Sequence, residues 1–160
     1  MERSIQEKRT QSEEGEQRSM KDAVIRDWQM RPWWMNLIFY FCAYMTLIYM
    51  PFDLFYKPVA EDEEVWFGIT LFGWWAKATA PLHWLIYAAL AYGFWRMKSW
   101  MWPWAAVYGL QVVIAMFVWN LLDHRGGGVI PGVIAATVFA IPTVALWRAR
   151  TLFQGVVQHG

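Results

Sequence analysis

Charged side chains are scarce over most of this 160-residue chain. Residues 1–31 hold 14 of its 27 Asp, Glu, Lys and Arg residues, and residues 32–160 consist of long apolar runs separated by short charged clusters. A soluble domain of this size needs far more charge on its surface. The scarcity therefore favours an integral membrane domain that follows a polar tail.

Net charge, cysteine and catalytic motifs are also sparse. A formal net charge of +1 gives no basic footprint for nucleic acid, and the single cysteine, Cys42, excludes an internal disulfide and a cysteine-based metal site. The chain has no nucleophile elbow, HExxH, P-loop or regular metal-ligand spacing. The apolar runs carry no gating charges or acidic proton relays, which argues against a pump or a voltage-driven channel. We therefore favour a protein without a metal site and without catalytic activity over an enzyme.

Four apolar segments can cross a hydrocarbon core of about 30 Å. We predict a transmembrane domain at residues 32–150, with spans at 33–52, 77–95, 100–122 and 129–147. Lys and Arg residues test the orientation: with both termini in the cytoplasm, eleven lie inside and only Lys57, Lys77 and Arg125 outside. The 13 tryptophans fall near the ends of the spans, as an aromatic belt requires. The expected fold is an all-α, four-helix bundle in the inner (plasma) membrane, N-in and C-in.

The apolar run from residue 65 to residue 95 is too long for one span, because a straight helix over it would measure about 46 Å. We predict an interfacial helix at residues 62–76, followed by a span that begins near Lys77. The Lys77 amine would then reach water at the edge of the core, and Pro81 would kink the helix there.

The two ends of the chain are predicted to be polar tails. Residues 1–31 form the cytoplasmic tail, flexible over 1–19 and amphipathic over 20–31, where Met20, Val24 and Trp28 recur every four residues. This segment is interpreted as a helix on the membrane surface, with a polar linker as the alternative. Residues 151–160, including His159, form the C-terminal tail.

Polar side chains inside the spans are few and fall at one depth. We predict a mid-membrane layer of Tyr44, His83, Gln111 and Thr137. Hydrogen bonds between helices, each worth roughly 1 kcal/mol or less, are the simpler interpretation. The alternative is a small pocket in which His83 binds a lipid or ligates a tetrapyrrole.

Two further groups of residues are candidates for interaction. The charged residues of the outer ends, Asp53, Glu61, Asp62, Glu63, Glu64, Lys77, Asp123, His124 and Arg125, are interpreted as a solvated rim with a few salt bridges. Small residues recur every fourth position in the last span, at Gly128, Gly132, Ala136 and Ala140. This stripe lets another helix approach closely, either within the bundle or from another subunit.

The layout resembles the EXPERA family of sterol isomerases and sigma-2-type receptors. That family has four spans, cytoplasmic termini and a long, proline-kinked second helix, and FDLFY (52–56) and VWFGITLF (65–72) lie where it has comparable segments. The acidic residue of the family's second helix is absent, and residues 74–77 take its place. The tryptophan-rich sensory family is excluded, because the chain lacks its fifth span and its W-x-P-P loop.

We expect a non-catalytic accessory subunit of a larger membrane complex, of the electron-transfer or light-harvesting (photosynthesis) type. Its expected partners are membrane lipids and other integral membrane subunits. The alternative, which the resemblance implies, is a lipid- or sterol-like ligand-binding protein or isomerase with an intramembrane pocket around His83 and Gln111.

Overall fold

The computed structural model describes residues 2–154, with side chains described for 15–22 and 24–154. It is mostly helical and divides into two compact units, residues 1–38 and 39–160. His159 and the rest of 155–160 lie outside the described residues.

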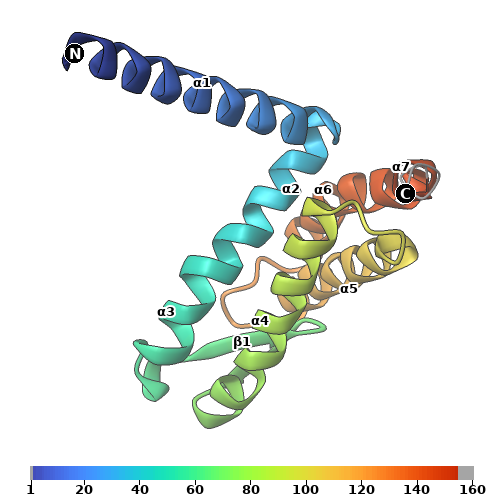
Figure 1. The fold of residues 1–160 in the computed structure, drawn as a ribbon. Helices are drawn as coiled ribbons and strands as arrows, with labels where there is room; N and C mark the ends of the chain where they lie inside the picture. Colours follow the sequence, from blue (N-terminus) through green and yellow to red (C-terminus); the bar gives the residue numbers. More distant parts are fainter. Residues whose placement is uncertain (1, 155–160) are drawn as a thin grey trace. The chain divides into compact units, whose positions relative to one another are not determined.

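The first unit holds α1 (Glu2–Gln29) and the start of α2 (Trp33–Tyr44) (Figure 1). Residues 1–19, predicted to be flexible unless a partner orders them, belong to α1, which begins at Glu2 and not after Ser19. The predicted amphipathic segment at 20–31 forms the last turns of α1 up to Gln29, and Met30 and Arg31 follow the helix. Pro32 separates the two helices.

The first predicted span is confirmed as a helix long and apolar enough to cross a membrane, over Trp33–Phe55. It consists of α2, a π-helical turn η1 (Met45–Tyr49) and α3 (Met50–Phe55). Pro51 has no N–H to donate to the residue one turn earlier, so the α-helical hydrogen-bond ladder is interrupted where the π turn lies.

A β-hairpin replaces most of the interfacial helix predicted at residues 62–76. After a short 3-10 turn, η2 (Val59–Glu61), β1 (Glu63–Trp66) pairs antiparallel with β2 (Ile69–Phe72). Phe67 and Gly68 connect the strands with φ values of 51° and 88°, as a two-residue turn with two left-handed positions requires. The helix prediction is wrong because residues 65–72 are mostly β-branched and aromatic, which favours strands on either side of such a turn.

Four helices follow the hairpin: α4 (Trp74–Trp95), α5 (Met101–Leu122), α6 (Val129–Arg148) and α7 (Arg150–Gln154). Of these, α5 and α6 are long and apolar enough to cross a membrane, and they occur where spans are predicted at 100–122 and 129–147. The predicted span at 77–95 is helical as part of α4, but α4 is not among the three candidate crossings of the described chain. α7 occupies the start of the predicted C-terminal tail.

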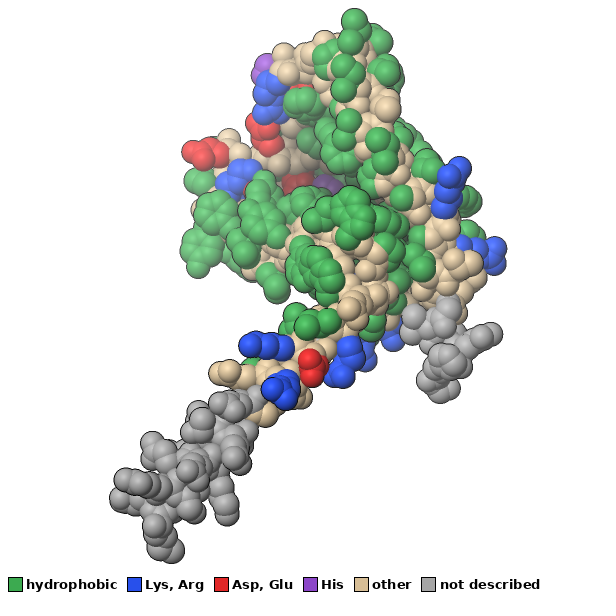
Figure 2. Space-filling view, turned by 90° about the horizontal axis from the view of Figure 1, so that it is seen from above, with side chains coloured by type: hydrophobic (Ala, Val, Ile, Leu, Met, Phe, Trp, Pro, Cys, Tyr) green, Lys and Arg blue, Asp and Glu red, His purple; other side chains and the backbone are tan. Residues whose placement is uncertain are grey.

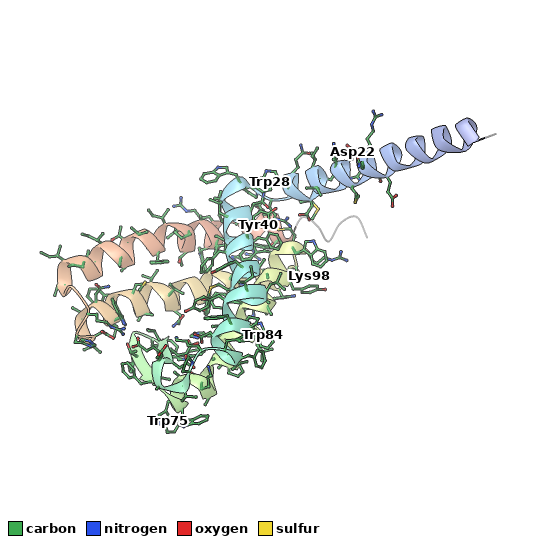
Figure 3. All side chains as sticks on the ribbon, turned by 90° about the vertical axis from the view of Figure 1, so that its left-hand side faces the viewer. Asp22, Trp28, Tyr40, Trp75, Trp84 and Lys98 are labelled. Atoms are coloured by element: carbon green, nitrogen blue, oxygen red, sulfur yellow. The ribbon has the colours of Figure 1, made fainter. Side chains whose placement is uncertain are left out.

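The α5 and α6 helices form a closely packed hairpin. A Cβ on Gly132 of α6 would lie 3.2 Å from Phe117 Cδ2 of α5, and one on Gly109 of α5 would lie 2.6 Å from Thr143 Oγ1 of α6. α4 runs across this hairpin and not along it (Figures 1 and 3). The predicted four-helix bundle is therefore not confirmed.

Most apolar side chains of the candidate spans are uncovered. In the most apolar window of each helix, the chain itself buries only 17% of residues for Trp33–Phe55, 22% for α5 and 11% for α6. Figure 2 shows hydrophobic side chains over much of the visible face, with acidic and histidine side chains lying among them.

Candidate functional site

Lys77 is the centre of a buried polar cluster where α3 ends and α4 begins. Its Nζ donates to the backbone carbonyls of Asp53 and Lys57, the latter at 3.0 Å, and lies 3.1 Å from Asp62 Oδ2. Its side chain is only 15% exposed, so the prediction that its amine reaches water is wrong. The last carbonyls of a helix have no partner within the helix, and a lysine there also complements the helix dipole.

Two aspartates and a second lysine complete the cluster. Asp53 Oδ1 accepts a 3.0 Å hydrogen bond from Lys57 Nζ, which also lies 3.4 Å from Asp62 Oδ1. Asp53 is 2% exposed and Asp62 is 1% exposed, so the predicted solvated rim is wrong for these residues. Burial lowers the pKa of Lys57, but Asp53 and Asp62 outweigh that effect and the net shift of its pKa is upward.

Several buried polar atoms of this region have no hydrogen-bond partner among the residues that the structure describes. They are Asp53 Oδ2, both carboxylate oxygens of Asp62 and Trp66 Nε1. The Asp62 oxygens lie within ion-pair distance of the two lysine amines but do not have hydrogen-bond geometry. Asp62 is therefore held by charge, and Asp53 keeps one free acceptor.

A second buried group joins β1 to α4. The alternation of a strand places Glu64 and Trp66 on the same side of β1, facing His83 of α4. The Glu64 carboxylate is hydrogen-bonded to His83 Nδ1, and the Trp66 ring stacks on the imidazole with centroids 3.9 Å apart and planes 3° apart. Glu64 is 7% exposed and His83 is 8% exposed, so Glu64 does not belong to a solvated rim either.

The Glu64–His83 contact determines what the histidine can do. Because Nδ1 is engaged, Nε2 is the ring nitrogen left for another partner, and it makes no hydrogen bond within the described chain. A carboxylate that orients an imidazole in this way is found where histidine binds a ligand or transfers a proton. Tyr87 is the next aromatic neighbour, 6.3 Å from the His83 centroid. No group of three or more His, Cys, Asp or Glu side chains within the described residues could hold a metal.

The structure does not bring the predicted layer together. Tyr44 and Thr137 are exposed, and Thr137 Oγ1 donates to Val133 O of its own helix at 2.8 Å. Gln111 is half-buried, and within residues 2–154 no hydrogen bond joins it to His83. His83 is the one predicted residue that lies in a buried polar site, and its partners come from the hairpin.

The small-residue stripe packs partly within the chain. Gly132 is buried against Phe117 and Asn120 of α5, whereas Ala136 and Ala140 are half-buried. A Cβ on Gly128 would meet nothing within 4 Å. Of the two interpretations of the stripe, packing within the bundle is therefore supported at its centre.

The outer edge of the hairpin is tied to the α5–α6 loop. Arg125 contacts Glu63 Oε2 at 2.7 Å and Asp123 Oδ1 at 3.0 Å, while Thr70 Oγ1 donates to Asp123 Oδ2 at 2.7 Å. The Arg125 hydrogen bonds, with that of Thr70, hold the pKa of Asp123 well below its usual range. His124 is 80% exposed in its side chain, so the predicted salt-bridged rim is present here.

Sequence reasoning missed the buried cluster, although two signals for it are present. Asp53 and Lys57 are four residues apart at the end of a helix, the spacing of an ion pair. Asp62, Glu64 and Trp66 alternate with period 2, so a strand puts all three on one side. The second signal is hidden when residues 62–76 are interpreted as a helix.

Comparisons with known proteins add no family to this description. No family model, curated protein or solved structure matches the chain. The resemblance in layout to the EXPERA family therefore has no match behind it, and any function must be inferred from the contacts above.

Proposed function

We propose that the chain is a non-catalytic subunit of a larger membrane complex, of the electron-transfer or light-harvesting type. The observation that carries this proposal is the low coverage of its candidate spans, of which the chain buries only 11–22%. The polar groups point the same way, because Lys57, Lys77, Asp62 and Arg125 are engaged with neighbours in the chain and not presented to a substrate.

The outer face of α6 is the best candidate for contact with another subunit. Ile130, Ile134, Val138 and Ile141 form a ridge along the helix and are 75%, 60%, 57% and 69% exposed. The opposite face of α6 packs on α5 through Gly132. A helix with one face packed and the other bare is suited to lie between its own hairpin and a neighbouring helix.

Photo-crosslinking in the native membrane tests this assignment. A photoreactive amino acid at Ile134 should form a crosslink to another protein, because Ile134 lies on the bare ridge. The matched control is Leu146, which lies on the same helix but is 6% exposed and should crosslink only within the chain. Crosslinks from Ile134 to lipid alone, together with migration as a free monomer after mild solubilisation, would refute the proposal.

We also propose that α4 crosses the inner membrane, so that the chain has four crossings and both termini in the cytoplasm. Arg96 and Lys98 directly follow α4, and Arg148 closes α6, so cationic residues lie at the ends that this topology places inside. Because α4 runs across the α5–α6 hairpin, it must change its direction relative to the hairpin if all four helices are to cross the membrane side by side. Reporter fusions after Lys98 and after the C-terminus test the topology, which fails if the two report opposite sides.

A second candidate function is supported by the Glu64–His83–Trp66 group. His83 Nε2 and the buried Trp66 Nε1 lack hydrogen-bond partners in the described chain. Trp66 Nε1 can donate to an oxygen of a lipid-like ligand, and Nε2 of the neutral His83 ring, whose proton on Nδ1 points to Glu64, can accept from a hydroxyl of that ligand. Small molecules that co-purify with the protein should then be lost in His83→Ala and kept in the control His124→Ala, which alters an exposed histidine. Absorption spectra of the same samples test for a tetrapyrrole. Equal ligand content in both variants would exclude a site at His83.

A further inference from the structure

The last turns of α1 carry an exposed apolar face. Met20, Val24, Ile25 and Trp28 are 60%, 67%, 52% and 46% exposed. Their spacing puts them on one side of the helix, and three of them line a shallow groove together with Gln17 and Lys21. Polar residues occupy the other side, where Arg18, Ser19, Asp22 and Arg26 line a separate surface hollow.

A buried polar clasp fixes the junction between α1 and α2. Arg31 forms an ion pair with Asp27 of α1 at 2.5 Å and donates from Nε to Asn36 Oδ1 of α2 at 2.8 Å. Asn36 Nδ2 in turn donates to the carbonyl of Trp28 at 2.9 Å. Arg31 is 4% exposed and Asn36 is fully buried. Because Arg31 and Asn36 satisfy each other out of water, with Asp27 36% exposed in its side chain at the edge, the clasp holds the end of α1 at a set direction to the start of α2.

We propose that residues 20–28 of α1 lie in the headgroup region of the bilayer, with this apolar face toward the hydrocarbon, and that the Asp27–Arg31–Asn36 clasp holds them there. The candidate span begins at Trp33, so its first residue is at the edge of the core. Trp28, which lies at the α2 end of α1 (Figure 3), is five residues away and cannot be more than about 18 Å from that edge. The apolar face is thus continuous with a helix suited to hydrocarbon.

The charges of this segment indicate whether its binding to the bilayer depends on anionic lipids. Residues 15–31 carry four cations and three anions, namely Arg18, Lys21, Arg26 and Arg31 against Glu16, Asp22 and Asp27. A polybasic segment depends on anionic lipid, but a nearly balanced one gains little from it. Apolar insertion therefore supplies the attachment, and neutral and anionic bilayers should hold the segment about equally.

Spin labels on the full chain in reconstituted vesicles test the proposal. In a Cys42→Ala background, one label replaces Val24 on the apolar face and a matched label replaces Ser19 on the polar face. The label at 24 should be more accessible to oxygen than to a water-soluble nickel chelate, and the label at 19 should show the reverse. These ratios should change by less than about twofold when anionic phosphatidylglycerol is added to neutral phosphatidylcholine.

Two outcomes would overturn the proposal. Equal exposure of both labels to the nickel chelate would mean that the face does not meet lipid and needs a protein partner instead. The clasp is tested by Asn36→Ala and, separately, by Asp27→Asn, each with the label at 24. Both variants should move the ratio at 24 toward the value at 19, with the helical circular dichroism retained. An unchanged ratio in both would show that the clasp does not position α1.

Discussion

Replacing Lys77 by methionine removes the ammonium that joins α3, the hairpin and α4 while keeping an apolar stem of similar length. The variant leaves the Asp53 and Lys57 carbonyls without their donor and takes one of two cations from Asp62, which is 1% exposed. Removing one partner of a buried ion pair costs about 3–5 kcal/mol. Lys57 remains 3.4 Å from Asp62, so we expect a smaller loss of about 2–4 kcal/mol in the free energy of unfolding.

The assay is unfolding of the purified protein in detergent, followed by circular dichroism during a titration with sodium dodecyl sulfate or during heating. A loss of about 3 kcal/mol corresponds to a fall of about 6–12 °C in Tm for a chain of this length. Lys98→Met is the matched control, because Lys98 is half-exposed and its recorded partner is the Tyr92 ring at 5.9 Å. That control should stay within about 0.5 kcal/mol of the parent protein.

A double-mutant cycle with Asp62→Asn isolates the charge pair. If Lys77 acts through Asp62, the two substitutions together should cost less than their sum by about 1–2 kcal/mol, because the second removes a charge that the first left uncompensated. If Lys77→Met destabilises the protein no more than Lys98→Met, the cluster does not hold the hairpin and the reasoning is refuted.

Three further predictions concern the hairpin and the α5–α6 pair. Gly68→Ala should lower the free energy of unfolding by about 2–4 kcal/mol in the same assay, because its φ is +88° and the new Cβ would lie 2.4 Å from Val118 Cβ. Its control is Gly128→Ala, where φ is +83° but the space is open, so only the cost of the left-handed backbone conformation should be lost. Gly132→Val should cost about 1–3 kcal/mol by separating α6 from α5, and an unchanged midpoint would place the stripe on a free face. The pKa of Asp123 is lowered in the folded protein, so the ionised carboxylate stabilises the fold fully above the pKa range of an ordinary aspartate, and this stabilisation is lost on acidification below about pH 4. Asp123→Asn should remove this acid-dependent loss of stability, which is measured as Tm against pH.

The membrane character of the chain is determined by the sequence alone. Long runs without charge leave no means of solvating a surface in water, and the helices over Trp33–Phe55, α5 and α6 occur where those runs do. Glycine and charge at residues 123–128 mark the turn between α5 and α6 correctly. These features depend on composition and local spacing, which do not need a fold to be interpreted.

The tertiary structure decided where the polar groups go. Composition places Lys77 inside an apolar run, at the start of a predicted span, but only the folding of α3 against α4 supplies the carbonyls that make burial of its amine tolerable. In the same way, the sequence points to His83, yet its partners Glu64 and Trp66 are 19 and 17 residues earlier and reach it only because β1 is a strand. Whether a polar side chain faces water or a partner depends on residues that are distant in the sequence and meet only in the fold. The tendency of a segment to avoid water, by contrast, depends on the residues of that segment alone.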